Sequence, residues 1–194
     1  MSTPRGRTGV QTKRWTREEY ERLLRLGVLG EDDHVQLIDG EIVELAPQGP
    51  PHATAVGLTQ RALQEAYGPG YHVRAQGPLT VSASSEPEPD VAVIRGDPRD
   101  YADEHPQTAA LVVEVADTTG HFDRVRKGPI YAAAGISGYW VVDLPARVVD
   151  VYRDAAQDAT GRGLYRVHER IDETGALAPP GTQGPPIKVS ALLP

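Results

Sequence analysis

The chain has 194 residues and no cysteine, which excludes a disulfide scaffold, a thiolate zinc site and a cysteine nucleophile, and fits a cytoplasmic protein. Its formal net charge of −7 is adverse for a nucleic-acid partner, because domains that bind nucleic acids usually carry a basic excess. No apolar run approaches the roughly 20 residues that span a bilayer. We therefore expect one domain over residues 15–194 and no membrane partner.

The N-terminal region begins with a basic stretch, residues 1–14, that lacks the apolar core of a secretory signal. It is predicted to be a disordered arm. Thr16 and Glu19 then form a capping-box pattern at the start of a helix over residues 17–26. The apolar face of this helix consists of Tyr20, Leu23 and Leu24, with Val28 beyond its end.

A hairpin and a longer helix are predicted next. Asp39-Gly40 separates two strand-like runs within residues 35–45, and this dipeptide is the strongest short-range signal for a hairpin. Apolar residues at helical spacing predict a helix over residues 52–67, which Gly68 ends.

The rest of the chain alternates strands with one helix. The strands are predicted over residues 71–76, 79–81, 90–95, 110–116, 138–144 and 148–153, with one or two more within 163–169 and 187–189. A helix is predicted over residues 122–134. The strand–helix–strand order over residues 110–144 favours an α/β fold with a mixed sheet.

Two carboxylates occur in apolar strands. Glu114 interrupts ALVVEVA, where a charge is costly unless it is paired, protonated or bound to a metal. Edge placement or a salt bridge to an arginine would also explain it. Asp90 opens the strand VAVI and alone would be an ordinary strand-entry residue. On neighbouring strands, the two could share a cleft and supply the oxygen ligands that Mg²⁺ prefers.

A polar stripe follows on the next helix, where Asp123, Lys127 and Tyr131 are spaced at i, i+4 and i+8. An exposed Asp–Lys pair, with the tyrosine at the edge of the core, would also give this spacing. Beside the two carboxylates, Lys127 could offset a developing negative charge or orient an attacking water.

The segments QLIDGEIVEL, PEPDVAVIRG, LVVEVADTT and DRVRKGPIYAAAGISGYWVVDL resemble the Uma-two restriction-endonuclease family of the PD-(D/E)XK nuclease superfamily. The resemblance covers roughly residues 15–153. It implies a restriction-endonuclease-like mixed β-sheet flanked by helices, and phosphodiester hydrolysis assisted by one or two divalent metals.

The resemblance assigns roles to the polar residues already noted. Pro89-Asp90 corresponds to the PD step, and Glu114 to the acidic residue of (D/E)XK. Ala116 stands where the strict motif has lysine. Lys127 occupies the place on the following helix where this family commonly has its lysine.

Four further residues have two readings each. By the resemblance, Glu41 is an additional acid near the site; the alternative is a strand glutamate that faces solvent. By the same resemblance, His52 is a functional histidine at a helix start; the alternative is a surface residue at the end of that helix. Gln76 reaches the site or faces solvent. This chain has Ala116-Asp117-Thr118-Thr119 where the family usually has Ser-Pro-Ser-Thr, and Asp117 adds charge near the metal or caps the next helix.

The implied site and partners follow. The catalytic residues are Asp90, Glu114, Lys127, Glu41 and His52. The metal ligands are Asp90, Glu114, the Val115 carbonyl and Glu41; the metal is Mg²⁺, for which Mn²⁺ can substitute. DNA is the partner, and a homodimer would suit the cutting of both strands. Arginines near the site could hold its phosphates, although exposed arginines are often merely solvated: Arg95, Arg99, Arg124 and Arg126.

Two other functions remain open. A nuclease-fold binding module without activity would fit the acidic charge and Ala116. A hydrolase that acts on sugars with two carboxylates is also conceivable, although the Lys127 stripe and an aromatic content of 6% count against it. The chain has no Walker lysine loop, no G-x-S-x-G and no H-E-x-x-H.

Overall fold

The computed structural model describes residues 11–45, 47–182 and 184–194. Of the predicted arm, residues 1–10 lie outside these ranges. Two later arm residues contact the domain: Lys13 forms an ion pair with Glu19, and Arg14 donates to the Asp39 carbonyl. No helix within the described ranges is long and apolar enough to cross a bilayer.

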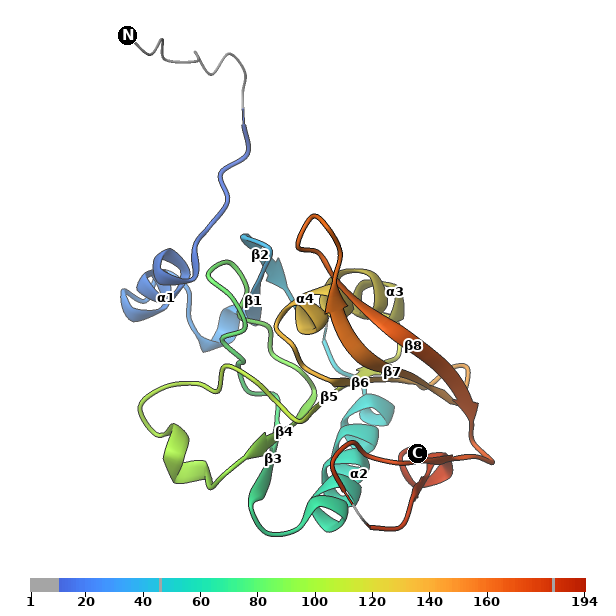
Figure 1. Cartoon of the computed structure of the whole chain (residues 1–194). Coiled ribbons are helices and arrows are strands. Elements are labelled where there is room, and N and C mark those ends of the chain that lie inside the picture. Colours follow the sequence, from blue (N-terminus) through green and yellow to red (C-terminus); the bar gives the residue numbers. More distant parts are fainter. Residues whose placement is uncertain (1–10, 46, 183) are drawn as a thin grey trace, which may run out of the picture.

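The protein has a mixed α/β fold (Figure 1). Its helical elements are α1 (Arg17–Arg25), η1 (Glu31–Asp33), α2 (Pro50–Tyr67), η2 (Pro98–Tyr101), α3 (Gly120–Phe122), η3 (Asp123–Lys127), α4 (Gly128–Ala133) and η4 (Val189–Ala191). Its strands are β1 (Val35–Ile38), β2 (Glu41–Glu44), β3 (Tyr71–Ala75), β4 (Val91–Arg95), β5 (Leu111–Ala116), β6 (Gly138–Asp143), β7 (Val148–Gln157), β8 (Gly163–Asp172), β9 (Ala176–Leu177) and β10 (Ile187–Lys188).

Six strands form the central sheet, in the order β3-β4-β5-β6-β7-β8. Strands β5 and β6 are parallel, and the other neighbouring pairs are antiparallel. The helical segment between β5 and β6 makes the crossover that a parallel pair requires. The predicted α/β class and mixed sheet are confirmed.

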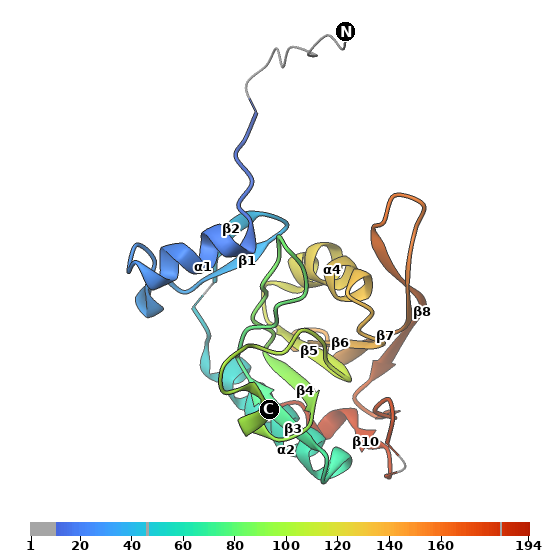
Figure 2. The same ribbon diagram turned by 60° about the vertical axis from the view of Figure 1, so that its left-hand side comes forward.

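Helices cover both faces of this sheet (Figures 1 and 2). On one face, α2 and the C-terminal residues pack on a core that includes Val113 and Trp140. On the other face, α4 packs on a core that includes Val112 and Tyr131. Because successive side chains of a strand point to opposite faces, Glu114 shares the α4 face with Val112.

The N-terminal elements form as predicted, apart from the apolar face of α1. Thr16 and Glu19 make the capping box, and Asp39-Gly40 joins β1 to β2 in an antiparallel hairpin. Tyr20 is the only buried residue of α1, and its hydroxyl donates to the Val35 carbonyl. The other apolar residues predicted for that face are at least partly exposed.

The strand predicted over residues 79–81 is wrong. The Leu79 amide donates to the Pro87 carbonyl, and the Thr80 amide donates to the Pro106 carbonyl. Because neither proline has an N–H to return, these contacts cannot continue as a β-ladder. The segment is instead part of the long loop that leads into β4.

The helix predicted over residues 122–134 is interrupted by η3, a π-helical turn that we call the π-turn. Pro129 has no N–H to offer the Val125 carbonyl, and its ring would clash with that carbonyl in a regular α-helix. The helix widens instead, so that the Gly128 N–H donates to the Asp123 carbonyl five residues earlier.

The start of β8 packs directly on the backbone of α4. A Cβ at Gly163 would overlap the Pro129 carbonyl oxygen and the Ala133 amide nitrogen. We expect Gly163→Ala to lower the free energy of unfolding by about 1–3 kcal/mol, because backbone atoms cannot move aside cheaply. Urea denaturation measures this loss.

Gly57→Ala is the matched control for this substitution. Gly57 lies inside α2 with open space around its Cα, so alanine should stabilise the protein by about 0.5–1 kcal/mol. Equal effects of the two substitutions would contradict the packing described for β8 and α4.

The loop before β4 is attached to the hairpin. The Glu86 N–H donates to the Leu37 carbonyl at 2.8 Å, and the Asp39 N–H donates to the Ser85 hydroxyl at 2.9 Å. Glu86 is 4% exposed, and its Oε2 has no hydrogen-bond partner among the described residues. Burial, helped by the charge of Glu21, raises the pKa of Glu86 to about 7.

This raised pKa makes stability depend on pH. The folded protein holds the Glu86 proton more tightly than the unfolded chain does, so its stabilising effect is complete below the unfolded pKa near 4.5 and is lost as the pH rises through 7. We expect Glu86→Gln to raise the free energy of unfolding by about 1–3 kcal/mol at pH 8 and by much less at pH 5. Urea denaturation at both pH values tests this, with the exposed Glu65→Gln as control; an equal gain at both would contradict it.

Candidate active site

An open cavity of about 900 Å³ lies where β4 begins, β5 ends, and α2 and the π-turn begin. The walls of this cavity include buried titratable residues from four different segments: His52, Asp90, Glu114, Asp123 and Lys127. Four of the five predicted catalytic residues are therefore brought together. Glu41 is the exception.

Asp90 lies beside Glu114, because β4 and β5 pair in the antiparallel register that continues to these two positions. Asp90 Oδ2 accepts the Val115 N–H at 2.8 Å and lies 3.2 Å from His52 Nε2. Asp90 Oδ1 makes no hydrogen bond to a described residue. Two carboxylates side by side on one sheet repel each other unless a cation lies between them.

Glu114 is held from the helical side of the cavity. Its Oε1 lies 3.0 Å from Lys127 Nζ and accepts the Tyr131 hydroxyl at 2.7 Å. Its Oε2 makes no hydrogen bond to another residue in the described part of the chain. Glu114 is in a central strand and its cation is a lysine, so neither edge placement nor an arginine salt bridge explains it.

Asp123 extends this cluster. Its Oδ2 accepts the Thr119 hydroxyl at 2.7 Å, and its Oδ1 lies 3.9 Å from Lys127 Nζ. The residue is 3% exposed, and Lys127 is 4% exposed. The alternative of an exposed Asp–Lys pair is therefore wrong, and the predicted stripe faces Glu114.

The charges in this cluster do not balance. Burial raises the pKa of Glu114 to about 8, and the charge of Lys127 offsets this only in part. Burial also raises the pKa of Asp123. Burial acts to lower the pKa of the Lys127 ammonium, but the three nearby carboxylates outweigh it and raise that pKa. With Asp90, three acids face one lysine, and a bound cation would relieve their repulsion.

His52 is buried at the start of α2, so the alternative of a surface residue is wrong. Its hydrogen bond with Asp90 raises the pKa of the imidazole against the opposing effect of burial. The backbone of Val115 also acts to raise this pKa. His52 Nδ1 has no partner by hydrogen-bond geometry within the described ranges. The histidine thus fixes the orientation of Asp90 through Nε2.

Glu41 does not reach the cavity. Its Oε1 lies 2.6 Å from Arg14, and its Oε2 accepts from Arg126 at 2.8 Å. The hydrogen bond from Arg126 and the charge of Arg14 lower the pKa of the Glu41 carboxyl, and the bond from Arg126 has the larger effect. Because both of its oxygens are engaged outside the cavity, Glu41 is not available as a ligand in this structure.

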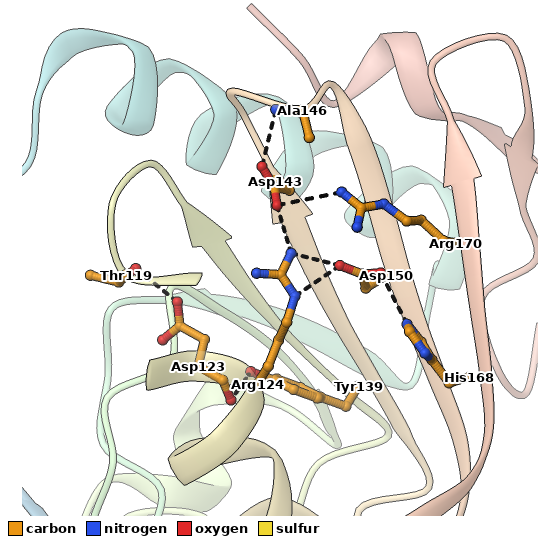
Figure 3. Close-up of polar contacts among 9 residues, drawn as sticks. All are labelled: Thr119, Asp123, Arg124, Tyr139, Asp143, Ala146, Asp150, His168 and Arg170. Atoms are coloured by element: carbon orange, nitrogen blue, oxygen red, sulfur yellow. Dashed lines mark hydrogen bonds and ion pairs between the residues drawn. The ribbon is translucent and has the colours of Figure 1, made fainter. Parts of the chain in front are cut away.

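The arginines expected to hold phosphates do not line the cavity either. These are Arg95, Arg99, Arg124 and Arg126. Arg124, for example, binds Asp143 and Asp150 on the sheet (Figure 3).

Other residues of the cavity wall were not predicted. Glu88 lies in the loop before β4, and burial raises the pKa of its carboxyl. Its amide donates to Gln36 Oε1 at 3.1 Å, and Gln36 is 1% exposed. The rim adds further acids, namely Asp32, Asp33 and Glu44. Two features of the sequence could have indicated these residues: Glu88 lies between two prolines, and Gln36 is a polar residue at a buried position of β1.

The sequence left two interpretations open for Gln76 and for Asp117. In the structure both residues are exposed and belong to the cavity wall. The side-chain Nε2 of Gln76 donates to Gln48 Oε1 at 2.6 Å. Asp117 does not cap α3, whose N-cap residue is Thr119 without a side-chain cap. Asp117 therefore adds charge to the rim.

The donor set fits a hard divalent cation. Asp90 and Glu114 each have one oxygen without a hydrogen bond, and the Val115 carbonyl points to the same side of β5 as the Val115 N–H that binds Asp90. Within the described ranges, no three His, Asp or Glu side chains form a metal-binding cluster by themselves. Mg²⁺ is usually held by one or two carboxylates, with water and substrate phosphates as its other ligands. Two carboxylates are thus a sufficient protein contribution.

Comparisons with known proteins bear on the family and the fold of the chain. The chain matches the family model described as "Uma2: Putative restriction endonuclease" over residues 17–183. It is similar to the crystal structure of a "putative nuclease belonging to DUF820" from Anabaena variabilis ATCC 29413, at 18% sequence identity and a TM-score of 0.67, covering 91% of this chain and 96% of that chain. That similarity confirms the nuclease fold. No curated protein matches the chain. Because the family model covers most of its length, the chain belongs to the Uma2 family of restriction-endonuclease-like proteins, as the resemblance implied.

Proposed function

We propose that this protein is a divalent-metal-dependent endonuclease that hydrolyses phosphodiester bonds in DNA. The observation that carries the proposal is the burial of Asp90 and Glu114 in one cavity, with Lys127 Nζ 3.0 Å from Glu114. Membership of a restriction-endonuclease family supports a nuclease function in general. The metal, the DNA substrate and the roles of individual residues are part of the proposal.

Asp90, Glu114 and the Val115 carbonyl would hold Mg²⁺ or Mn²⁺. When bound, such a metal polarises the phosphoryl oxygen and lowers the pKa of a bound water. Glu41 has no part in this ligand set, because both of its oxygens bind arginines. His52 keeps Asp90 oriented, which is the usual role of a group hydrogen-bonded to a metal ligand.

Lys127 supplies the positive charge of the site. Its ammonium is buried and keeps its proton, because the surrounding carboxylates raise its pKa. From this place it can donate to a phosphate oxygen on which charge develops, in a site where water screens little. Tyr131 donates to Oε1 of Glu114, and Oε2 would be the oxygen that remains for the metal.

The acidic wall explains why a cation should be required. The cavity is lined by many carboxylates and by one lysine, and no arginine is among its residues in the described ranges. A DNA phosphate would be repelled from this wall unless metal ions neutralise part of it. We therefore expect binding of DNA in the cavity to depend on the divalent metal.

The alternative functions have lost part of their support. The inactive binding module rested in part on Ala116, but Lys127 reaches Glu114 from the helix. A sugar hydrolase would be expected to use aromatic stacking surfaces, and Phe122 is the only Phe, Trp or Tyr among the described residues of the cavity wall.

The test is cleavage of supercoiled plasmid and of single-stranded DNA, with Mg²⁺, with Mn²⁺ and with EDTA. We expect nicked and then linear plasmid with either metal, and intact plasmid with EDTA. A folded protein that binds Mn²⁺ but leaves every DNA substrate intact would support the inactive module. Sedimentation of the protein with and without DNA tests the proposed homodimer.

A further inference from the structure

A second polar cluster lies on the sheet beside the π-turn, outside the cavity (Figure 3). Arg124, the second residue of the π-turn, donates from Nε and Nη2 to Asp150 Oδ2 at 2.9 and 2.6 Å. Its Nη2 also donates to Asp143 Oδ2 at 2.7 Å. One arginine thus joins the helical segment to strands β6 and β7.

Both acids of this cluster have fixed positions. Asp150 is 1% exposed, and its Oδ1 lies 3.0 Å from His168 Nε2. Burial acts to raise the pKa of Asp150, but the hydrogen bonds from Arg124 and His168 outweigh it, so the pKa is lowered and the carboxylate stays charged. Asp143 Oδ1 accepts the Ala146 N–H at 3.1 Å. Arg124 is therefore bound to a rigid part of the sheet.

The sequence around the π-turn makes room for this arrangement. A Cβ at Gly120 would overlap Nη1 of Arg124, so glycine leaves space for the guanidinium. On the same segment, the Tyr139 hydroxyl donates to the Asp123 carbonyl at 3.0 Å. The π-turn is thus attached to the sheet at two neighbouring residues.

We propose that Arg124, held by Asp150 and Asp143, is a positioning residue that keeps Lys127 against Glu114. Lys127 is three residues after Arg124, so the attachment fixes the rotation of the turn that carries it. A shift of one residue in helical phase turns a side chain by about 100°, which would take Lys127 out of the cavity. The effect of Arg124 on catalysis rests on the proposed function, whereas its effect on the position of Lys127 does not.

The lysine content of the chain allows a direct measurement. There are three lysines, and Lys13 and Lys188 are exposed, whereas Lys127 is buried. Protein labelled with ¹⁵N-lysine should show one slowly exchanging ammonium signal, which Lys127→Met removes. The chemical shift of this signal reports the contact with Glu114 without any need for activity.

The variants are Arg124→Met and Asp150→Asn, with Arg124→Lys as the conservative change and Arg166→Met as control. Arg166 is an exposed arginine on β8 whose nearest acid is 3.5 Å away. We expect the Lys127 signal to shift or to be lost in the first two variants, to recover in part with Arg124→Lys and to be unchanged in Arg166→Met. In Arg124→Met and Asp150→Asn, we expect kcat for DNA cleavage to fall by about 10-fold to 100-fold, with little change in KM.

An unchanged Lys127 signal in folded Arg124→Met and Asp150→Asn would overturn the proposal. If Arg124→Met does not fold, Asp150→Asn and Arg124→Lys decide the matter alone, because both keep a polar partner in place. Absence of cleavage by the parent protein would contradict the proposed function only, since the ammonium signal tests the positioning role separately.

Discussion

Asp90→Asn is expected to reduce metal-dependent cleavage of DNA by roughly a thousandfold. Asparagine keeps an oxygen that can accept the Val115 N–H, so the fold should persist, whereas the charge that would bind the metal is removed. Alanine at the same position would also leave that buried amide without an acceptor, at a cost of about 1–3 kcal/mol. The amide variant therefore separates chemistry from stability. Plasmid cleavage with Mg²⁺ and circular dichroism measure the two effects.

Asp103→Asn is the matched control, because Asp103 is exposed and lies outside the cavity. It should cleave at the parental rate. If Asp90→Asn also cleaved at that rate, the candidate site would be wrong.

Lys127→Met is expected to lower cleavage by about 100-fold to 1000-fold while leaving Mn²⁺ binding intact or tighter. The two effects differ in sign, because the ammonium assists the reaction but repels a metal that binds to Glu114. Removal of the cation also leaves Glu114 and Asp123 buried without it, which commonly costs about 3–5 kcal/mol. Uptake of a proton by Glu114, whose pKa is already raised, should reduce this cost.

Lys188→Met, at an exposed position, is the control for the loss of a lysine. Calorimetric titration with Mn²⁺ and plasmid cleavage are measured on both variants. Loss of Mn²⁺ binding in Lys127→Met, or cleavage at the parental rate, would contradict the role given to this lysine.

Local sequence signals predicted much of the fold because they depend on short-range physics. Asp39-Gly40 adopts positive φ at both residues, the conformation that a two-residue hairpin turn requires. Thr16 and Glu19 satisfy free amides at the start of α1 regardless of the rest of the chain. A glutamate in an otherwise apolar buried strand indicated Glu114 because burial of a lone carboxylate is costly.

The two incorrect element predictions have different causes. Residues 79–81 resemble a strand, but the Leu79 and Thr80 amides bind the carbonyls of Pro87 and Pro106, two contacts that the strand-like pattern does not reveal. The helical spacing of residues 122–134 does not show that Pro129 widens the helix into a π-turn. The prediction that Lys127 faces Glu114 is nevertheless confirmed, and Tyr131 of the same stripe contacts Glu114 as well.

The placement of Glu41 and Glu88 could not be read from the sequence either. Glu41 binds Arg126, which is 85 residues away, and that contact removes it from the cavity. Glu88 enters the cavity wall because its loop is attached to Gln36 on the hairpin. Both outcomes depend on how the hairpin lies on the domain, and residue types alone do not determine this.

The most direct test of the central claim is calorimetric titration with Mn²⁺ of the parent protein and of Asp90→Asn. If Asp90 and Glu114 hold the metal, the parent should show a saturable Mn²⁺ site, and the variant should lose most of that affinity. Binding of equal strength in the two proteins, or none in the folded parent, would contradict a metal site at the meeting point of β4 and β5.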